Sequence, residues 1–172
     1  MSRSLNDLDV GTRAMCFDFQ SECQEQGLDI LITCTFRPPD EQARLFRQGR
    51  TLEQIHAKQQ ELIDLGAPKM AKILIAVGPQ SNPNIVTNAG PGQSVHQYRK
   101  AFDFVPVVNG KPVWGTNGED GILWQRCGRI AENVGLEWAG RWTTFREFPH
   151  CQQRGFDWHD AIKTLNSVRW PT

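Results

Sequence analysis

The sequence lacks the long apolar runs and the unbalanced charge that identify several classes of protein. It has no uninterrupted apolar stretch of about 18 or more residues, so no membrane span is expected. Its first ten residues, MSRSLNDLDV, contain no apolar segment of the kind found in signal peptides. Nineteen basic residues balance nineteen acidic ones, and the resulting net charge of zero argues against a nucleic-acid partner.

The cysteine pattern also excludes two classes of protein. There are five cysteines, an odd number, and no two of them form a C-x-x-C pair. A disulfide framework and a thiolate zinc cluster are therefore not expected. Cys151 follows His150 directly, but neighbours on an extended chain point to opposite sides, which argues against a cysteine nucleophile. Cys16 and Cys23 stand seven residues apart in a helical pattern, and we interpret them as small core residues.

The chain has the length and composition of one globular domain. It has 172 residues, of which 39% are hydrophobic and 22% charged, enough for a sizeable core. We find no internal repeat, low-complexity tract or linker. The sequence therefore predicts a single domain over residues 1–172.

Hydrophobic periodicity predicts helices and hairpin-joined strands in an irregular order. The predicted helices are residues 11–26, 37–49, 51–65, 120–135 and 157–165. The predicted strands are residues 28–34, a hairpin over 102–114 around an Asn-Gly turn, and 136–138. Residues 71–84 form an apolar run that breaks into a turn-rich loop. Strands and helices do not alternate regularly, so the predicted class is α+β. In the first helix the predicted inward positions include Ala14, Phe17 and Cys23.

Two of the four histidines have ordinary explanations. His56 lies in the polar helix predicted at residues 51–65, and we expect it to be solvated. His159, at the start of the last helix, also reads as a surface residue. The remaining two, His96 and His150, have better surroundings for chemistry.

Both of these histidines have a carboxylate nearby in the sequence. His96 and Asp103 stand seven residues apart in SVHQYRKAFDF, either as unrelated surface residues or as two ligands of one metal. Glu147 precedes His150 by three residues in REFPH. A zinc hydrolase needs three protein ligands, an open position and a carboxylate that takes a proton from water. The residues His96, Asp103, His150 and Glu147 could supply that set.

Two segments resemble a known family. SVHQYRKAFDF resembles the S-x-H-x-x-G-x-A-x-D motif of the zinc peptidoglycan peptidases related to D-alanyl-D-alanine carboxypeptidases. EWAGRWTTFREFPHCQ is similar to their second signature, W-G-G-x-W followed by D/E-x-P-H. The resemblance implies zinc as the cofactor, held by His96, Asp103 and His150, with Glu147 as the catalytic base.

Upstream segments resemble one branch of that family. LDILITCTFRPPDEQARLFRQGRT and IVTNAGPGQSVH are similar to segments of the phage endolysin and cell-wall L-alanyl-D-glutamate endopeptidases. The resemblance covers roughly residues 5–152. It implies that Arg37 is catalytic, because a guanidinium can bind a carboxylate or an oxyanion. Further substrate-binding candidates are Gln42, Ser94 and Trp138. The simpler alternatives are a helix-start arginine, a surface glutamine and a packed tryptophan.

The chain departs from the family pattern at a few places. Arg99 stands where the family usually has Gly. If that position needs a positive φ, Arg99 is strained or the turn differs. Ala139 replaces another Gly, and residues 52–84 look like an insertion.

The resemblance implies a small antiparallel sheet with helices packed on it and zinc at the sheet's open face. The implied function is a zinc-dependent peptidase that cuts the L-Ala-D-Glu bond of bacterial peptidoglycan. Such a phage or prophage endolysin would act as a monomer and wait in the host cytoplasm until lysis. The alternatives are a D,D-carboxypeptidase and a non-catalytic zinc-binding module of a cell wall or virion.

Overall fold

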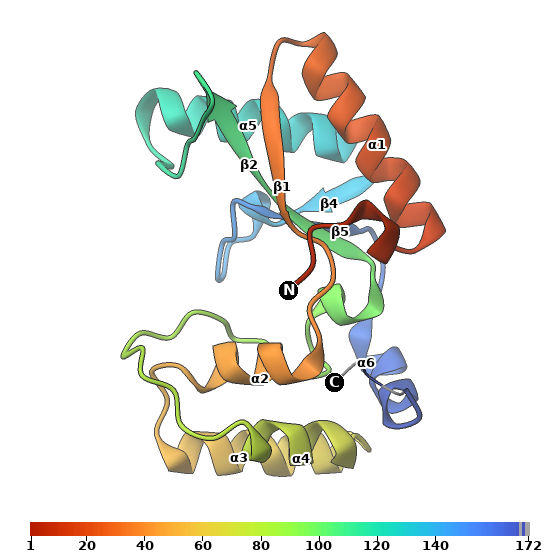
Figure 1. Cartoon of the computed structure of the whole chain (residues 1–172), viewed down its shortest axis with the longest axis vertical. Coiled ribbons are helices and arrows are strands. Elements are labelled where there is room, and N and C mark those ends of the chain that lie inside the picture. Colours follow the sequence, from red (N-terminus) through yellow and green to blue (C-terminus); the bar gives the residue numbers. More distant parts are fainter. Residues whose placement is uncertain (169, 171–172) are drawn as a thin grey trace. The chain divides into compact units, whose positions relative to one another are not determined.

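The computed structural model describes residues 1–168 and 170, and it confirms the α+β class (Figure 1). The chain divides into two compact units. The first comprises Met1–Phe36 and Tyr98–Phe156, and the second comprises Arg37–Gln97 and Asp157–Thr172. The single domain predicted over residues 1–172 stays a prediction. None of the helices in the described residues is long and apolar enough to cross a membrane.

The first unit is an antiparallel sheet with two long helices. The sheet order is β1-β2-β5-β4, with β3 paired to β2. Its strands are β1 (Asp29–Cys34), β2 (Ala101–Val108), β3 (Lys111–Pro112), β4 (Leu136–Trp138) and β5 (His150–Gln153). The helices are α1 (Val10–Glu25) and α5 (Gly118–Asn133), with short 3-10 turns η1 (Leu5–Asp7) and η3 (Ala139–Arg141). The predicted hairpin is confirmed, and β5 is a strand that the sequence did not predict.

The hairpin forms for the predicted reason. Asn109 and Gly110 connect β2 to β3 with φ values of 51° and 74°. A two-residue hairpin turn of this kind requires positive φ at both positions, which Asn and Gly tolerate best.

Alternation along the strands separates a core face from a polar face. Phe102 and Phe104 on β2 are fully buried in one cluster with α1 and α5 residues. Phe19 of α1 lies edge-on to Phe104, with ring centroids 5.0 Å apart. Because successive strand residues point to opposite faces, Asp103 is directed to the other face of the sheet.

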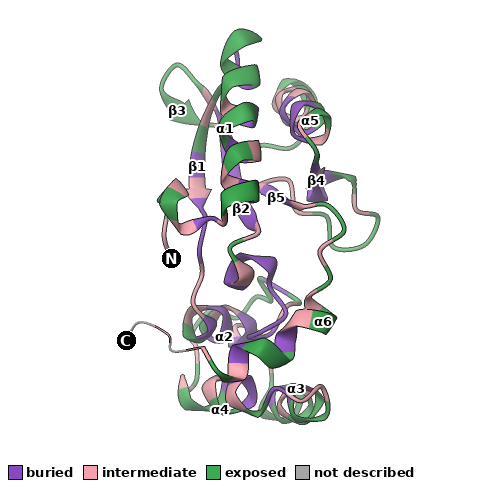
Figure 2. Cartoon of the chain, turned by 90° about the vertical axis from the view of Figure 1, so that its right-hand side faces the viewer, coloured by how far each residue is buried: buried purple, intermediate pink, exposed green. Residues whose placement is uncertain are grey.

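Helix α1 buries a different stripe from the one predicted. Its buried positions are Thr12, Cys16, Phe19 and Cys23, which share one face at helical spacing. Phe17 is 55% exposed, so its predicted place in the core is wrong. In Figure 2 exposed and buried residues alternate along α1, as expected for a helix with one buried face. Cys16 and Cys23 are fully buried in the core cluster, which confirms their interpretation as core residues.

Asp9 fixes the start of α1. Its Oδ1 accepts a hydrogen bond from the Thr12 amide at 2.8 Å, and its Oδ2 lies 2.6 Å from Lys100 Nζ. Burial raises the pKa of Asp9, but the hydrogen bonds from Lys100 and Thr12 and the charge of Lys100 outweigh this, so the pKa is lowered. A carboxyl with a lowered pKa stabilises the fold above its unfolded pKa, and this stabilisation is lost as the pH falls through the folded pKa.

We expect Asp9→Ala to lower the free energy of unfolding by about 1 kcal/mol at neutral pH, because the helix loses its cap. Asp9→Asn keeps a cap acceptor and loses only the charge, so its cost should be smaller. Urea unfolding checks both variants. The difference between Asp9→Asn and wild type should disappear below the folded pKa of Asp9, and a difference that persists there contradicts this account.

The second unit is helical. It contains α2 (Pro39–Arg47), α3 (Leu52–Asp64), α4 (Pro68–Ala76), α6 (Trp158–Ala161) and the 3-10 turns η2 (Val95–Tyr98) and η4 (Ile162–Asn166). Tyr98, the last residue of η2, belongs to the first unit. The predicted capping box at the start of α3 is present between Thr51 and Gln54. The apolar run predicted from residue 71 begins inside α4, and the turn-rich loop follows it.

Candidate functional site

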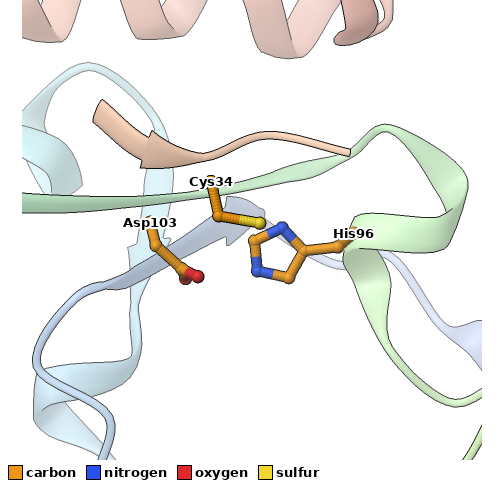
Figure 3. A group of neighbouring side chains, drawn as sticks. All are labelled: Cys34, His96 and Asp103. Carbon is orange, nitrogen blue, oxygen red and sulfur yellow. The ribbon is translucent and has the colours of Figure 1, made fainter. Parts of the chain in front are cut away.

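A row of ligand-type side chains crosses the polar face of the first unit's sheet. Asp103 on β2 pairs with Cys34 on β1 and with His150 on β5. The register of β1 shifts between Ile32 and Cys34, which brings Cys34 opposite Asp103. Figure 3 shows Cys34 and Asp103 directed to the same side of their strands. The figure also draws His96, which belongs to η2 in the second unit.

Asp103 and His150 are spaced like two ligands of one metal ion. His150 Nδ1 lies 3.2 Å from Asp103 Oδ1, and both side chains are largely shielded from solvent. A tetrahedral zinc with ligand bonds of about 2.0–2.1 Å holds its ligand atoms about 3.3 Å apart. One nitrogen and one oxygen at this separation therefore fit the predicted ligand pair.

The charges of Asp103 and Glu147 both act on His150. Burial lowers the pKa of His150, but the hydrogen bond and charge of Asp103, the charge of Glu147 and a hydrogen bond with Gln152 outweigh it. The pKa of His150 is therefore raised. The His150 amide also donates to the Glu147 carbonyl at 3.3 Å, so both residues lie on one tight turn.

The second ring nitrogen of His150 faces an amide. His150 Nε2 lies 3.0 Å from Gln152 Oε1, and Gln152 Nε2 donates to Glu137 Oε2 at 3.2 Å. Trp142 Nε1 donates to the other oxygen of Glu137 at 2.8 Å. Gln152 thus holds the His150 ring at Nε2, the nitrogen that does not face Asp103.

Trp138 has a packing role. It is 1% exposed, and its Nε1 donates to the Phe148 carbonyl at 2.8 Å. A Cβ added to Gly128 would lie 2.1 Å from the Trp138 ring, and a Cβ added to Gly140 would also lie 2.1 Å from it. The two glycines of α5 and η3 therefore make room for this ring. Core packing is a sufficient reason for a tryptophan at position 138. The predicted contact of Trp138 with substrate stays a prediction.

We expect Gly128→Ala to destabilise the first unit by about 1–3 kcal/mol, because the new methyl group overlaps a buried indole that has no space to move. Gly11→Ala is the matched control, since Gly11 also lies in a helix but its added Cβ would meet nothing closer than 3.6 Å. The control should be neutral or stabilising. Urea unfolding compares the two, and a Gly128→Ala protein as stable as wild type would contradict this packing.

Within the second unit Gln42 supports Arg37. Arg37 donates to Gln42 Oε1 at 3.0 Å, and Gln42 Nε2 donates to the Ala89 carbonyl at 2.7 Å. Gln42 is fully buried, so the alternative of a surface glutamine is wrong. These contacts give Gln42 a role in orienting Arg37, while its predicted contact with substrate stays a prediction. Ser94 is also buried, and its carbonyl accepts from the Gln97 amide at 3.0 Å.

Two of the sequence segments that carried the resemblance meet in the second unit. Arg50, from QGRT, donates to the Thr87 carbonyl of VTNA at 2.7 Å. Its guanidinium also lies 3.8 Å from the centre of the Phe46 ring. Arg50 and Gln42 together hold residues 87–89, which lie shortly before Ser94 and His96 in the chain.

Arg99, which stands where the family usually has Gly, has a left-handed backbone conformation. Its φ is 63°, in the left-handed region. Its guanidinium donates to the Asp7 carbonyl at 2.9 Å and lies 4.6 Å from the centre of the Phe36 ring. Arg99 is therefore strained at this position, as the sequence predicted for a site that needs a positive φ, and its side chain is held by these two contacts.

The two histidines expected at the surface are there. His56 is exposed on α3. His159 pairs with Asp157 at 2.6 Å and stacks on Trp158, with both members of the pair more than half exposed. Neither belongs to the polar face of the sheet.

Sequence reasoning missed three residues of this site: Cys34, Glu137 and Gln152. Gln152 follows His150 by two residues, so it lies on the same face once HCQQ is recognised as a strand. Glu137 pairs with Gln152 across β4 and β5. The alternation of LEW and HCQQ was the available signal.

Comparisons with known proteins show what this chain is similar to. Residues 87–153 match the family described as D-alanyl-D-alanine carboxypeptidase. The peptidoglycan L-alanyl-D-glutamate endopeptidase CwlK of Bacillus subtilis (strain 168) is 30% identical over 134 residues, which cover 74% of this chain. The chain spans 62% of the length of that relative.

Solved structures show the same fold. The L-Ala D-Glu endopeptidase ChiX of Serratia marcescens superposes with a TM-score of 0.50 at 14% identity, over 94% of this chain and 91% of that one. The vancomycin-resistance D,D-pentapeptidase VanY, solved in complex with Zn(II), also gives 0.50, at 15% identity, over 94% and 79% of the two chains. At these identities the likeness concerns the fold alone, and it confirms the predicted fold.

Proposed function

We propose that this protein is a zinc-dependent peptidase acting on the peptide part of bacterial peptidoglycan. The match of residues 87–153 to the family described as D-alanyl-D-alanine carboxypeptidase supports the proposal. One observation carries the proposal: Asp103 and His150 hold ligand atoms 3.2 Å apart, with the charge of Glu147 beside them. We assign the zinc to His96, Asp103 and His150. A non-catalytic zinc module would not need the carboxylate of Glu147.

When bound, zinc lowers the pKa of water towards neutrality and polarises a carbonyl group. Glu147 accepts a proton from the water that attacks the peptide carbonyl. As the C–N bond breaks, Glu147 returns this proton to the leaving amine, so the carboxylate ends each turnover unprotonated.

We assign the L-Ala-D-Glu bond as the target. The support is the 30% identity to an endopeptidase with this named specificity, together with the resemblance of the upstream segments. Peptidoglycan stem peptides continue through the γ-carboxyl of D-Glu, so its α-carboxylate is free. Arg37, oriented by Gln42, offers the two-pronged donor that binds such a carboxylate.

Mass spectrometry of digested peptidoglycan tests this assignment. Endopeptidase action leaves L-Ala on the glycan and releases stem peptides with a D-Glu amino terminus. A D,D-carboxypeptidase, the alternative that the description of the matched family favours, releases D-Ala and leaves the stems attached. Release of D-Ala alone would overturn the endopeptidase assignment.

The biological setting that we propose is lysis by a phage or prophage endolysin. It rests on the resemblance of the segments around Arg37, Arg50 and His96 to that branch. Co-expression with a protein that opens the inner membrane should then lyse the host, whereas expression alone should not. Lysis by expression alone would contradict this setting.

Arg37→Lys should fall about tenfold or more below wild type in kcat/KM, because an ammonium cannot replace the bidentate fork. The loss should depend on the substrate. Wild type should prefer stems with a free D-Glu α-carboxylate over stems in which this group is an amide, and Arg37→Lys should lose the preference.

Arg44→Lys is the matched control, because Arg44 lies on α2, which begins two residues after Arg37, and forms an exposed pair with Asp40. It should behave as wild type on both substrates. An Arg37→Lys enzyme with wild-type preference would show that another group reads the α-carboxylate.

A further inference from the structure

A hydrogen-bonded chain of side chains leads away from His150 within the first unit. It runs from His150 Nε2 to Gln152 Oε1 at 3.0 Å, and from Gln152 Nε2 to Glu137 Oε2 at 3.2 Å. It ends at Trp142, whose Nε1 donates to Glu137 Oε1 at 2.8 Å. None of these three partners has a role in the chemistry described so far.

The pairing of the sheet strands sets the positions of these hydrogen-bonded side chains. His150 and Gln152 are two residues apart on β5 and share its polar face. Glu137 lies opposite Gln152 in the register of β4 and β5. Trp142 follows the short turn η3, and its ring centroid lies 5.8 Å from that of His150. Backbone pairing therefore fixes which side chains meet.

The chemistry of Trp142 and Glu137 determines which group donates and which accepts in each of these hydrogen bonds. An indole N–H only donates, and a carboxylate only accepts. The group of Gln152 that faces Glu137 must then be its NH₂, which leaves its carbonyl oxygen towards His150. That oxygen can only accept, so His150 must carry a proton on Nε2.

We propose that Gln152, oriented by Glu137, is a positioning residue that holds His150 as the Nε2–H tautomer. In this tautomer the lone pair of a neutral imidazole is on Nδ1, the nitrogen 3.2 Å from Asp103 Oδ1. Nδ1 is then the atom that ligates the metal. This inference rests on the proposed zinc site.

Burial makes the contact necessary. His150 is 7% exposed and Gln152 is 8% exposed, so water cannot readily replace the amide. An apolar residue at 152 would leave the Nε2 proton without a partner, and the ring would then favour the other tautomer or another orientation. After either change, the Nδ1 lone pair of His150 would no longer be available at the position beside Asp103 where the metal would bind.

Gln152→Leu tests the proposal in the full chain. We expect its zinc dissociation constant, measured by competition with a chromophoric chelator, to rise about 10–100-fold. Gln153→Leu is the matched control on the same strand. Gln153 alternates to the opposite side and bonds Lys100 at 2.8 Å, so its loss removes a hydrogen bond without touching His150. The control should bind zinc as tightly as wild type.

Glu137→Gln is a second variant that keeps the size of the side chain. An amide at position 137 can donate or accept, so it no longer forces the NH₂ group of Gln152 to face it. Zinc affinity should therefore fall, but by less than in Gln152→Leu. This variant also tests the proposal if Gln152→Leu does not fold. Zinc affinities equal to wild type in the folded variants would overturn the inference.

A spectroscopic measurement separates this role from mere packing. Imidazole ¹⁵N spectra of the zinc-loaded wild type should show His150 with its proton on Nε2 and the metal on Nδ1. The opposite assignment would overturn the inference and leave the proposed function standing. A wild-type protein that neither binds zinc nor cleaves peptidoglycan would instead overturn the proposed function.

Discussion

Glu147→Gln is expected to lower turnover on peptidoglycan about 10²–10⁴-fold, the usual cost of losing a general base. The amide matches the carboxylate in size and polarity, but it cannot take the proton from water. Because Glu147 is assigned as base and not as ligand, zinc content and melting temperature should change little. Solubilised stem peptides, counted over time by mass spectrometry, give the rate.

A matched control separates this effect from a general loss of charge. Glu22→Gln removes a carboxylate exposed on α1 in the same unit and should keep wild-type turnover. If Glu147→Gln keeps wild-type turnover, the base lies elsewhere. The next candidates by sequence are Asp157 and Asp160, although Asp157 already accepts hydrogen bonds from the amide and ring of His159.

The sequence predicted the fold best where the signal is local. The hairpin around Asn109 and Gly110 follows from residues that tolerate positive φ, and it is present. Strand β5 was missed because its four residues, His150–Gln153, contain only one that packs in the core. Phe17 was misplaced because hydrophobicity alone does not say which stripe of α1 meets the sheet. Packing buries Cys16 and Phe19 instead.

The site divides in the same way. Spacing and resemblance predicted His150, Asp103 and Glu147. In the first unit His150 lies 3.2 Å from Asp103, and the charge of Glu147 acts on it. Gln152 and Glu137 could not be found by spacing, because strand register makes them neighbours although they are 15 residues apart. Gln42 was predicted at the substrate, yet its burial and its bond to Ala89 first make it a support for Arg37.

Removing a histidine ligand should remove most of the bound zinc. Wild type is expected to carry about one zinc per chain, the ratio of a mononuclear site, and His96→Ala or His150→Ala should carry far less. Elemental analysis of the purified proteins measures this directly. His56→Ala and His159→Ala are matched controls, since both residues are exposed and should leave the zinc content unchanged.

Thermal unfolding gives an independent readout of the same loss. A metal that binds only the folded chain stabilises it by about 4 kcal/mol at a free concentration 1,000 times its dissociation constant. The melting temperature of wild type should therefore be higher with zinc than with a chelator. The melting temperature of His150→Ala should be the same under the two conditions. Equal melting of wild type under the two conditions, or full zinc occupancy in both histidine variants, would show that these residues do not hold the metal.

Cys34 allows the third ligand to be identified. It pairs with Asp103 from the strand opposite His150, and a cysteine sulfur is a good zinc ligand in its own right. If His150 is the ligand, Cys34→Ala should keep the zinc while His150→Ala loses it. The reverse result would place the metal on the β1 side of Asp103 and leave His150 outside its ligand set. Both variants remove one neighbour of Asp103, so this effect is common to them. A difference in zinc content between the two variants therefore reports which residue binds the metal.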